Sequence, residues 1–194
     1  MDVLTGEHVA LRPLEPGDAE LTLAWRRGPR ARLLLDGAGT VEEQRAWIAS
    51  RPPTERNYVI ELRDGRPVGM LSLVDIDLVN RRAESGRFLI GDEEAVRGVP
   101  AAVEAMLLLY RLAFDELGLE RIYGIVAEEN RRMIKWQRYL GMQEEGRLRR
   151  HVRIDGRPCD VICLGLLAEE YRAQAEPRMR ALIAAAKPRK EMVG

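Results

Sequence analysis

The sequence predicts a single α/β (α+β) domain in which a central mixed, mostly antiparallel sheet is flanked by helices. Strand-like alternation dominates the first half, and turn residues such as Asp64 and Gly65 separate its runs. A long apolar helix over 101–117 is followed directly by a strand over 121–127, and such a crossover implies one parallel pair of strands. At 194 residues the chain fits one domain with a sizeable core.

Turn and capping residues delimit a first strand and two helices. Residues 8–14 alternate as a half-buried strand does, and Asp18 is a candidate N-cap for a helix over 19–27. Thr40, with Glu43 three residues later, has the pattern of a capping box and predicts the start of a second helix.

The rest of the chain is expected to alternate strands with helices. The further strand-like runs are 58–62, 67–77, 83–90, 121–127, 143–154 and 159–166. After the strand over 121–127, a helix opens at Asn130 and is closed by Gly141. Residues 1–167 make up the domain, and 168–194 form a C-terminal helical extension that packs on it, joins a homodimer or frays.

Composition argues against several classes of function. Lys plus Arg number 31 and so do Asp plus Glu, which leaves no overall field to attract nucleic acid or an anionic membrane. No apolar run is long enough for a membrane span and no secretory pattern is visible, so we expect a cytoplasmic protein. Cys159 and Cys163 are expected to be buried thiols, and His8 and His151 supply no ligand spacing, so no metal site is expected.

The segment before the long helix has the features of an anion site. Arg97 and Gly98 precede a helix start near Pro100, where unpaired backbone N–H groups and the positive end of the helix dipole favour a pyrophosphate. A solvated arginine beside a helix-initiating proline is the alternative, and spacing alone does not separate the two.

With its neighbours, this segment resembles the pyrophosphate motif of the GNAT acetyltransferases, particularly the RimJ/RimL-like and amino-sugar branches. The motif Gln/Arg-x-x-Gly-x-Gly/Ala aligns with Arg97, Gly98, Val99, Pro100, Ala101 and Ala102. The resemblance covers roughly residues 6–167 and implies a GNAT-type domain in which the fourth and fifth strands splay apart to admit a thioester. Proline replaces the central glycine of the motif, which removes one backbone donor.

Two further segments resemble the same family. Residues 129–142 resemble the signature Asn-x-x-Ala/Ser followed by Gly-Phe, which implies that Asn130 contacts the pantetheine arm of the cofactor. Arg132 and Lys135, on the same helix, are candidates for contacts with cofactor phosphates. Residues 83–90 resemble the fourth strand, and this implies that three residues pair through their backbones with the pantetheine amides: Phe88, Leu89 and Ile90.

The resemblance also implies candidate catalytic residues. Glu84 is expected on the acceptor side, where burial can raise the pKa of a carboxyl group and make it a base for the incoming ammonium. The alternative is an exposed strand residue paired with an arginine such as Arg81 or Arg82. Glu128, which follows the fifth strand, is the second candidate base.

One position departs from the pattern of many relatives. They carry a tyrosine seven residues after the conserved asparagine, and that position is Gln137 here. Tyr139 lies about 200° further around the helix and is expected to face elsewhere. The group that protonates the leaving thiolate is therefore left open.

The activity that the resemblance implies is transfer of an acyl group from acetyl-CoA or another acyl-CoA to a primary amine. A small-molecule acceptor such as an amino sugar ranks first and a protein amino terminus second. Trp25 and Arg26 are candidate substrate-binding residues, because the first helices cover the acceptor in amino-sugar enzymes, although tryptophans here are more often core residues.

Two other interpretations stay open. In the first, the donor is the phosphopantetheine of an acyl carrier protein, which has no adenosine diphosphate to fill a loop weakened by Pro100. Its acidic surface would meet the arginines Arg131, Arg132, Arg147, Arg149 and Arg150. In the second, the chain is a non-catalytic module that binds acyl-CoA.

Overall fold

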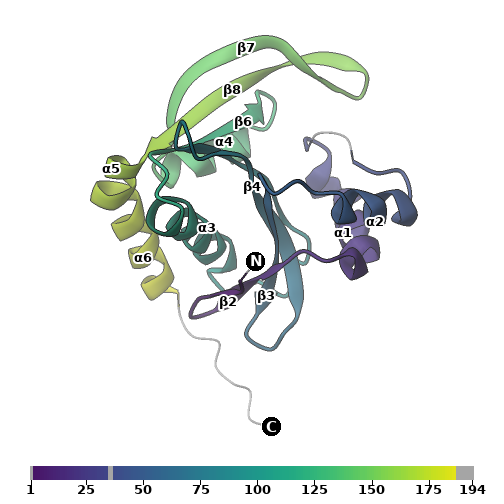
Figure 1. Ribbon diagram of the computed structural model, residues 1–194, viewed down its shortest axis with the longest axis horizontal. Helices are drawn as coiled ribbons and strands as arrows, with labels where there is room; N and C mark the ends of the chain where they lie inside the picture. The colour runs from purple at the N-terminus through teal and green to yellow at the C-terminus, as the bar shows by residue number, and fades with distance from the viewer. Residues whose placement is uncertain (1, 35–36, 187–194) are drawn as a thin grey trace.

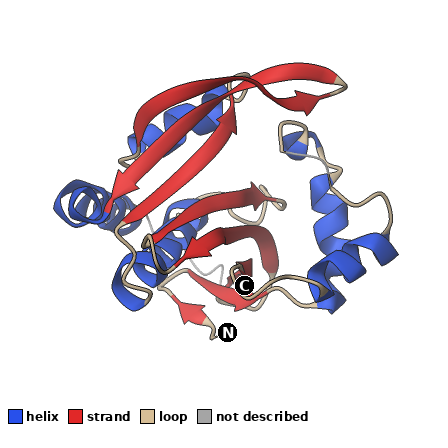
Figure 2. Ribbon diagram, turned by 45° about the horizontal axis from the view of Figure 1, so that its top comes forward, coloured by secondary structure: helices blue, strands red, loops and turns tan. Residues whose placement is uncertain are grey.

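The computed structural model describes residues 2–34 and 37–186, which form one sheet with helices on both of its faces (Figure 1, Figure 2). The strands are β1 (Leu4–Thr5), β2 (Val9–Pro13), β3 (Arg56–Leu62), β4 (Pro67–Asp77), β5 (Arg82–Ile90), β6 (Arg121–Ala127), β7 (Gln143–Ile154) and β8 (Arg157–Leu167). The helices are α1 (Ala19–Arg26), α2 (Val41–Ala49), α3 (Ala101–Arg111), α4 (Arg131–Tyr139), α5 (Ala168–Glu170) and α6 (Glu176–Ala185). The mixed α/β architecture expected from the sequence is confirmed.

The sheet has one parallel pair of strands, and that pair is incomplete. The strand order is β1-β2-β3-β4-β5-β6-β8-β7, and every neighbouring pair except β5 and β6 is antiparallel. β5 and β6, which α3 connects, pair only over 82–84 and 121–123. Beyond Glu84 and Tyr123 the two strands part, so the splay implied by the resemblance is present.

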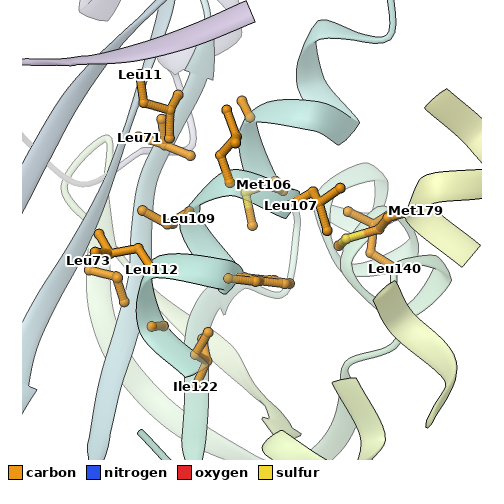
Figure 3. Close-up of a cluster of buried hydrophobic side chains, with 14 of the residues drawn as sticks. Leu11, Leu71, Leu73, Met106, Leu107, Leu109, Leu112, Ile122, Leu140 and Met179 are labelled. Atoms are coloured by element: carbon orange, nitrogen blue, oxygen red, sulfur yellow. The ribbon is translucent and has the colours of Figure 1, made fainter. Parts of the chain in front are cut away.

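The main core lies between α3 and one face of the sheet (Figure 3). Met106 and Leu109 of α3 are fully buried, as are Leu71 and Leu73 of β4 and Ile122 of β6. α3 is apolar on nearly all sides, as expected of a helix enclosed by protein. This packing fixes the start of α3 relative to the parted strands.

The C-terminal segment packs on α3 over its described part. Tyr171, Ala175, Met179 and Ile183 are buried against the main core, and Tyr171 stacks on Phe114 with ring centroids 4.8 Å apart. Packing is thus observed for 168–186, and 187–194 lie outside the described residues.

The opposite face carries α1 and α2, which rest on smaller apolar clusters. Leu14, Ala19, Ile48 and Val59 make up one of them. A buried hydrogen bond of 3.0 Å from Gln44 Nε2 to Thr22 Oγ1 joins the two helices. The capping box of α2 is confirmed, with both of its hydrogen bonds formed.

Asp18 lies at the predicted N-cap position of α1, but its side chain makes no capping hydrogen bond to that helix. Residues Pro16–Asp18 already form a 3₁₀ turn, so Asp18 lies inside a continuous helical segment. Its carboxylate instead accepts hydrogen bonds from the Glu15 N–H at 2.8 Å and from Arg12 at 2.9 Å. Burial opposes ionisation, but these hydrogen bonds outweigh it and lower the pKa of Asp18.

β7 and β8 form a long hairpin that arches from the sheet towards α1 and α2 (Figure 1). Near its tip, Ile154 and Val152 pack with Leu33 of the segment between α1 and α2. Arg32 Nε also lies 3.6 Å from Asp155 Oδ2. The hairpin tip and this segment therefore meet beside the parted strands.

Within the described ranges, no helix has the length and apolarity needed to cross a bilayer. The same ranges hold no group of three or more His, Cys, Asp or Glu side chains arranged to bind a metal ion.

Candidate active site

A cleft of about 620 Å³ opens where β5 and β6 part. Its walls come from β4, β5, β6, α2 and α4, and from the segment between α1 and α2. Side chains alternate along a strand, so Glu84 and Tyr123 project from the α1–α2 face, and Ala83 and Ile122 from the α3 face. The cleft therefore connects the two faces of the sheet through the gap between its strands.

Glu84 is the carboxylate in the cleft with the properties of a base. It is half-buried, and burial, reinforced by the nearby charge of Asp75, raises its pKa above the ordinary carboxyl value. The alternative of a pair with a neighbouring arginine is wrong, because Arg81 binds Glu120 at 2.6 Å and Arg82 lies 3.5 Å from Asp77.

Asp75 is placed beside Glu84 by a β-bulge. The register between β4 and β5 shifts after Val74, and Asp75 has a φ of 50°, which turns its side chain towards β6. Tyr123 Oη lies 3.5 Å from Asp75 Oδ2. Among the residues that the structure describes, neither Glu84 nor Asp75 has a cationic side chain within ion-pairing distance.

Glu55, which also lines the cleft, is held in an ion-pair network. Arg87 Nη1 donates to Glu55 Oε2 at 2.7 Å and to Asn57 Oδ1 at 2.9 Å. Burial of Glu55 opposes ionisation, but the hydrogen bonds from Arg87 and Asn57 outweigh it and lower the pKa. Arg87 also lies over the ring of Trp47, 5.0 Å from its centroid. Glu55 is thus a wall of the cleft and a poor base.

Arg87 also changes which way the rest of β5 faces. A register shift against β4 and a φ of 54° at Arg87 mark a second bulge. After it, Phe88 projects towards α4 and stacks on Trp136 with ring centroids 4.9 Å apart. Leu89 packs with Met70 on the α1–α2 face. The edge of β5 from Gly86 onward has no partner in β6, so its outward N–H and C=O groups can pair with an extended ligand.

The α3 side of the gap is lined by α4. Asn130 caps this helix, as predicted, by accepting a hydrogen bond from the Met133 N–H at 3.2 Å. Asn130, Met133 and Gln137 share one face of α4 and line the cleft. Gln137 is only 5% exposed, and its Oε1 has no hydrogen-bond partner.

The loop predicted to bind an anion leads into α3, as expected. Two of its backbone N–H groups already donate hydrogen bonds within the loop. The N–H groups of Arg97 and Val99 donate to the carbonyls of Glu94 and Val96, at 3.2 Å and 3.0 Å. Gly98 has a φ of 78°, a conformation that favours glycine. The first N–H groups of α3, those of Ala101 and Ala102 among them, have no partner within the helix and point into the loop.

Other predicted cofactor contacts are exposed and weakly held. The Arg97 side chain is 80% exposed, and its nearest acidic partner is Glu94 at 3.9 Å. Arg132 and Lys135 are exposed on α4 and do not line the cleft. Tyr139 is also exposed and contacts Arg178, so the expectation that it faces away from the site is confirmed.

Glu128 and the two predicted acceptor residues lie in different surroundings. Glu128 Oε2 is 3.0 Å from Arg147 Nη2, and this glutamate does not line the cleft. Trp25 packs in the apolar clusters beneath the sheet and against Gly91, as a core residue does. Arg26 lines the cleft.

Sequence reasoning did not identify Asp75 or the pair of Glu55 and Arg87 as cleft residues. Each reaches the cleft through strand register or a bulge. The local sequence does not report which residues of distant strands face one another. The sequence signal for Asp75 is that two Asp residues, Asp75 and Asp77, end the largely apolar run 67–77.

Comparisons with known proteins all point to the same family. Residues 8–143 match the family model for the acetyltransferase (GNAT) domain. YdaF of Bacillus subtilis (strain 168), whose name assigns it provisionally to the ribosomal N-acetyltransferases, is 31% identical over 180 residues, 87% of this chain and 96% of that protein. The spermidine N(1)-acetyltransferase of Escherichia coli (strain K12) is 34% identical over 121 residues, 62% of this chain and 63% of that protein.

Solved structures share the fold. A GCN5-related N-acetyltransferase from Brucella melitensis superposes with a TM-score of 0.81 at 25% identity, covering 95% of this chain and 86% of that one. A point mutant of a spermidine N-acetyltransferase from Vibrio cholerae superposes with a TM-score of 0.76 at 25% identity, covering 88% of this chain and 100% of that one.

Proposed function

Because this chain belongs to the GNAT acetyltransferase family, we propose that it transfers an acetyl group from acetyl-CoA to a primary amine of a small, cationic molecule. The observation that carries the proposal is the pair of carboxylates at the acceptor mouth. Glu84 and Asp75 lie side by side there, and neither forms a salt bridge in the described part of the chain; Arg87, whose charge acts on Glu84, is paired with Glu55. An acceptor with two ammonium groups supplies one charge for each carboxylate.

The names of relatives agree with an amine acceptor. Several are spermidine N(1)-acetyltransferases, and spermidine is a polyamine. An amino sugar with a single amine would leave one of the two carboxylates unpaired, and it therefore ranks below a diamine or polyamine.

Several features of the donor side fit acetyl-CoA as co-substrate. A Cβ built at Gly124 would lie 3.4 Å from Gln137 Oε1 and 3.5 Å from the Ser85 carbonyl, so the glycine leaves an opening between them. The free edge of β5 offers backbone partners for the pantetheine amides, and the start of α3 offers N–H groups for the diphosphate. Pro100 removes one donor from that loop, so we expect the diphosphate to be held less strongly than by a glycine loop.

In the proposed reaction Glu84 takes a proton from the acceptor ammonium. The neutral amine then attacks the thioester carbonyl from the α1–α2 face, and a backbone N–H on the free edge of β5 stabilises the oxyanion. The C–N bond forms and the nitrogen releases its second proton to water; the C–S bond breaks, and the sulfur leaves with the bonding pair. Neither cysteine lines the cleft, so transfer should persist in a protein that carries both Cys159→Ala and Cys163→Ala.

The acceptor class is tested by thiol release from acetyl-CoA with matched amines. The panel contains a linear triamine, a diamine, a monoamine of the same length and an amino sugar. We expect the triamine and the diamine to give the highest kcat/KM. A higher value for the monoamine or the amino sugar would overturn the cationic acceptor, and calorimetric binding of acetyl-CoA without release for any amine would favour a binding module.

The carrier-protein donor is tested with the same amines. The arginine cluster that would receive a carrier is partly occupied, because Arg147 pairs with both Glu128 and Asp160. We expect acetyl-CoA to react faster than an acetylated carrier protein at equal concentration. The opposite order would reassign the donor.

A further inference from the structure

Gln137 lines the cleft, and its side-chain amide is buried without its full set of hydrogen bonds. It is 95% buried, since its exposed fraction is 5%, and neither Oε1 nor the Nε2 amide group forms a hydrogen bond with another described residue. An unpaired polar group at such depth lowers the stability of the folded protein. Buried polar groups in native proteins are nearly always paired, so an unpaired one that lines a cleft points to a ligand as the missing partner.

The position of Gln137 relative to Glu84 gives that partner a chemical identity. Gln137 lies over Gly124 on the α3 face, immediately after the last paired residues of β5 and β6. Glu84 projects from the opposite face. In the tetrahedral intermediate of acyl transfer, the attacking nitrogen and the leaving sulfur occupy different corners around the reacting carbon. Glu84 faces the nitrogen, and a thioester that enters along the α4 side of the gap has its sulfur beside Gln137.

We propose that Gln137 hydrogen-bonds the departing sulfur through its amide N–H, so that this enzyme expels coenzyme A as a thiolate instead of protonating it with a side chain. The inference rests on the proposed function. As the C–S bond breaks, the sulfur keeps the electron pair and takes its proton from water afterwards. The amide O then accepts the S–H of the product thiol, because a glutamine amide offers both a donor and an acceptor.

One face of α4 lines the cleft and bears Gln137. That face carries no side chain that could protonate the sulfur. The titratable residues that line the cleft, within the described ranges, come from other elements: Arg26, Glu43, Glu55, Asp75, Glu84 and Arg87. Tyr110 of α3 faces the same gap near Ser85, but it is fully buried, does not line the cleft, and burial raises the pKa of its hydroxyl group. Tyr123 of β6 projects with Glu84 from the acceptor face.

The test replaces Gln137 with methionine, which has a similar volume and no hydrogen-bonding head group. One hydrogen bond to a charged atom corresponds to about a tenfold to hundredfold change in rate, and we expect Gln137→Met to lower kcat with acetyl-CoA by that factor. With acetyl-seleno-CoA, whose selenol is a better leaving group, the loss should be much smaller.

A binding measurement adds a readout that does not depend on turnover. Calorimetry at a pH above the pKa of the thiol compares coenzyme A with desulfo-coenzyme A. The unmodified protein should prefer coenzyme A, and Gln137→Met should lose that preference while binding desulfo-coenzyme A as before. Tyr110→Phe is the control, because it removes another buried unpartnered atom on the same side of the sheet and should change none of these values.

Three outcomes would overturn the proposal. They are an unchanged kcat in Gln137→Met, an equal loss with both donors, and equal weakening of coenzyme A and desulfo-coenzyme A. A thermal melting curve shows that the variant is folded, and removal of the unpaired amide should leave Tm unchanged or higher. If the unmodified protein acetylates no amine, the proposed function fails instead, and the calorimetric comparison still tests the contact with sulfur.

Discussion

The two faces of the sheet are built differently around the same gap. The α3 face, where we propose that the donor binds, rests on a helix whose residues are almost all buried in one continuous core, and α4 presents uncharged side chains to the cleft. The α1–α2 face, where we propose that the acceptor binds, rests on small apolar clusters and on polar contacts such as those of Arg87 with Glu55. One face is organised by packing and the other by charge.

This difference suggests how the two substrates are treated. A rigid wall suits a ligand whose structure does not vary, as expected of the donor, because burial fixes side chains and excludes water. A wall of charged side chains selects its ligand by complementary charge, and single substitutions change it without disturbing the core. We therefore expect donor binding to be sensitive to packing and acceptor choice to be sensitive to charge.

The largest effect is expected at Glu84, the proposed base. Glu84→Gln removes the base, and general-base catalysis contributes typically about 10²–10⁴-fold, so kcat should fall by that order while the Kd of acetyl-CoA stays the same. Steady-state kinetics and calorimetry measure the two quantities. Glu120→Gln, at the exposed end of the same strand pair, is the matched control. If Glu128→Gln lost as much activity as Glu84→Gln, the assignment of the base would fail.

The next largest effect is on stability, and it compares a core substitution on each face of the sheet. Leu109→Ala, in the core under α3, should lower the free energy of unfolding by about 3 to 5 kcal/mol, and Ile48→Ala, in the cluster under α2, by about 2 to 3 kcal/mol. Urea unfolding gives both values. Of the two, only Ile48→Ala should also raise KM for the amine. A greater loss of stability in Ile48→Ala would contradict the contrast.

A smaller effect is expected from Asp75. Its charge helps to keep the pKa of Glu84 raised, after the larger contribution of burial, and Asp75→Asn removes it. The pKa of Glu84 should then fall, so the base stays ionised to lower pH and the acidic limb of the kcat/KM profile moves to lower pH. KM for a diamine should rise about fivefold, as expected for a lost exposed ion pair of about 1 kcal/mol. A limb that moves to higher pH would show that Asp75 does not act through Glu84.

The smallest effect is expected at Arg97 on the donor side. Its exposed guanidinium adds about 0.3 to 1 kcal/mol to binding of a phosphate, so Arg97→Ala should weaken acetyl-CoA about twofold to fivefold with kcat nearly unchanged. The weakening should shrink as salt is added, because an exposed pair is screened. A loss of kcat larger than the loss of affinity would place Arg97 in the reaction itself.

Most of the fold was predictable because its signals are local. The bounds of β6, the capping box of Thr40 and Glu43 and the cap at Asn130 follow from short patterns of apolar spacing and turn chemistry. Asp18 shows the limit of such signals. Its carboxylate forms an ion pair with Arg12 of β2 and leaves the N–H groups at the start of α1 uncapped.

The site was predictable only in part, because its pieces depend on register. The gap between β5 and β6 and the position of Glu84 follow from the resemblance to a family, and Gln137 was noticed as a departure from that family's pattern. The bulges at Asp75 and Arg87 were not visible, since one extra residue in a strand leaves no composition signal and redirects every side chain after it.

The contact between Arg32 and Asp155 has a consequence for the order in which the pocket is completed. It joins positions from opposite ends of the chain, and contacts of such wide sequence separation form late, after the segments between them are in place. It is also held by exposed side chains, so local fluctuations should open it long before the helices under the sheet loosen. Amide hydrogen exchange would then be fast at the hairpin tip and slow in α3, and the side of the cleft beside the hairpin tip would assemble late and open first.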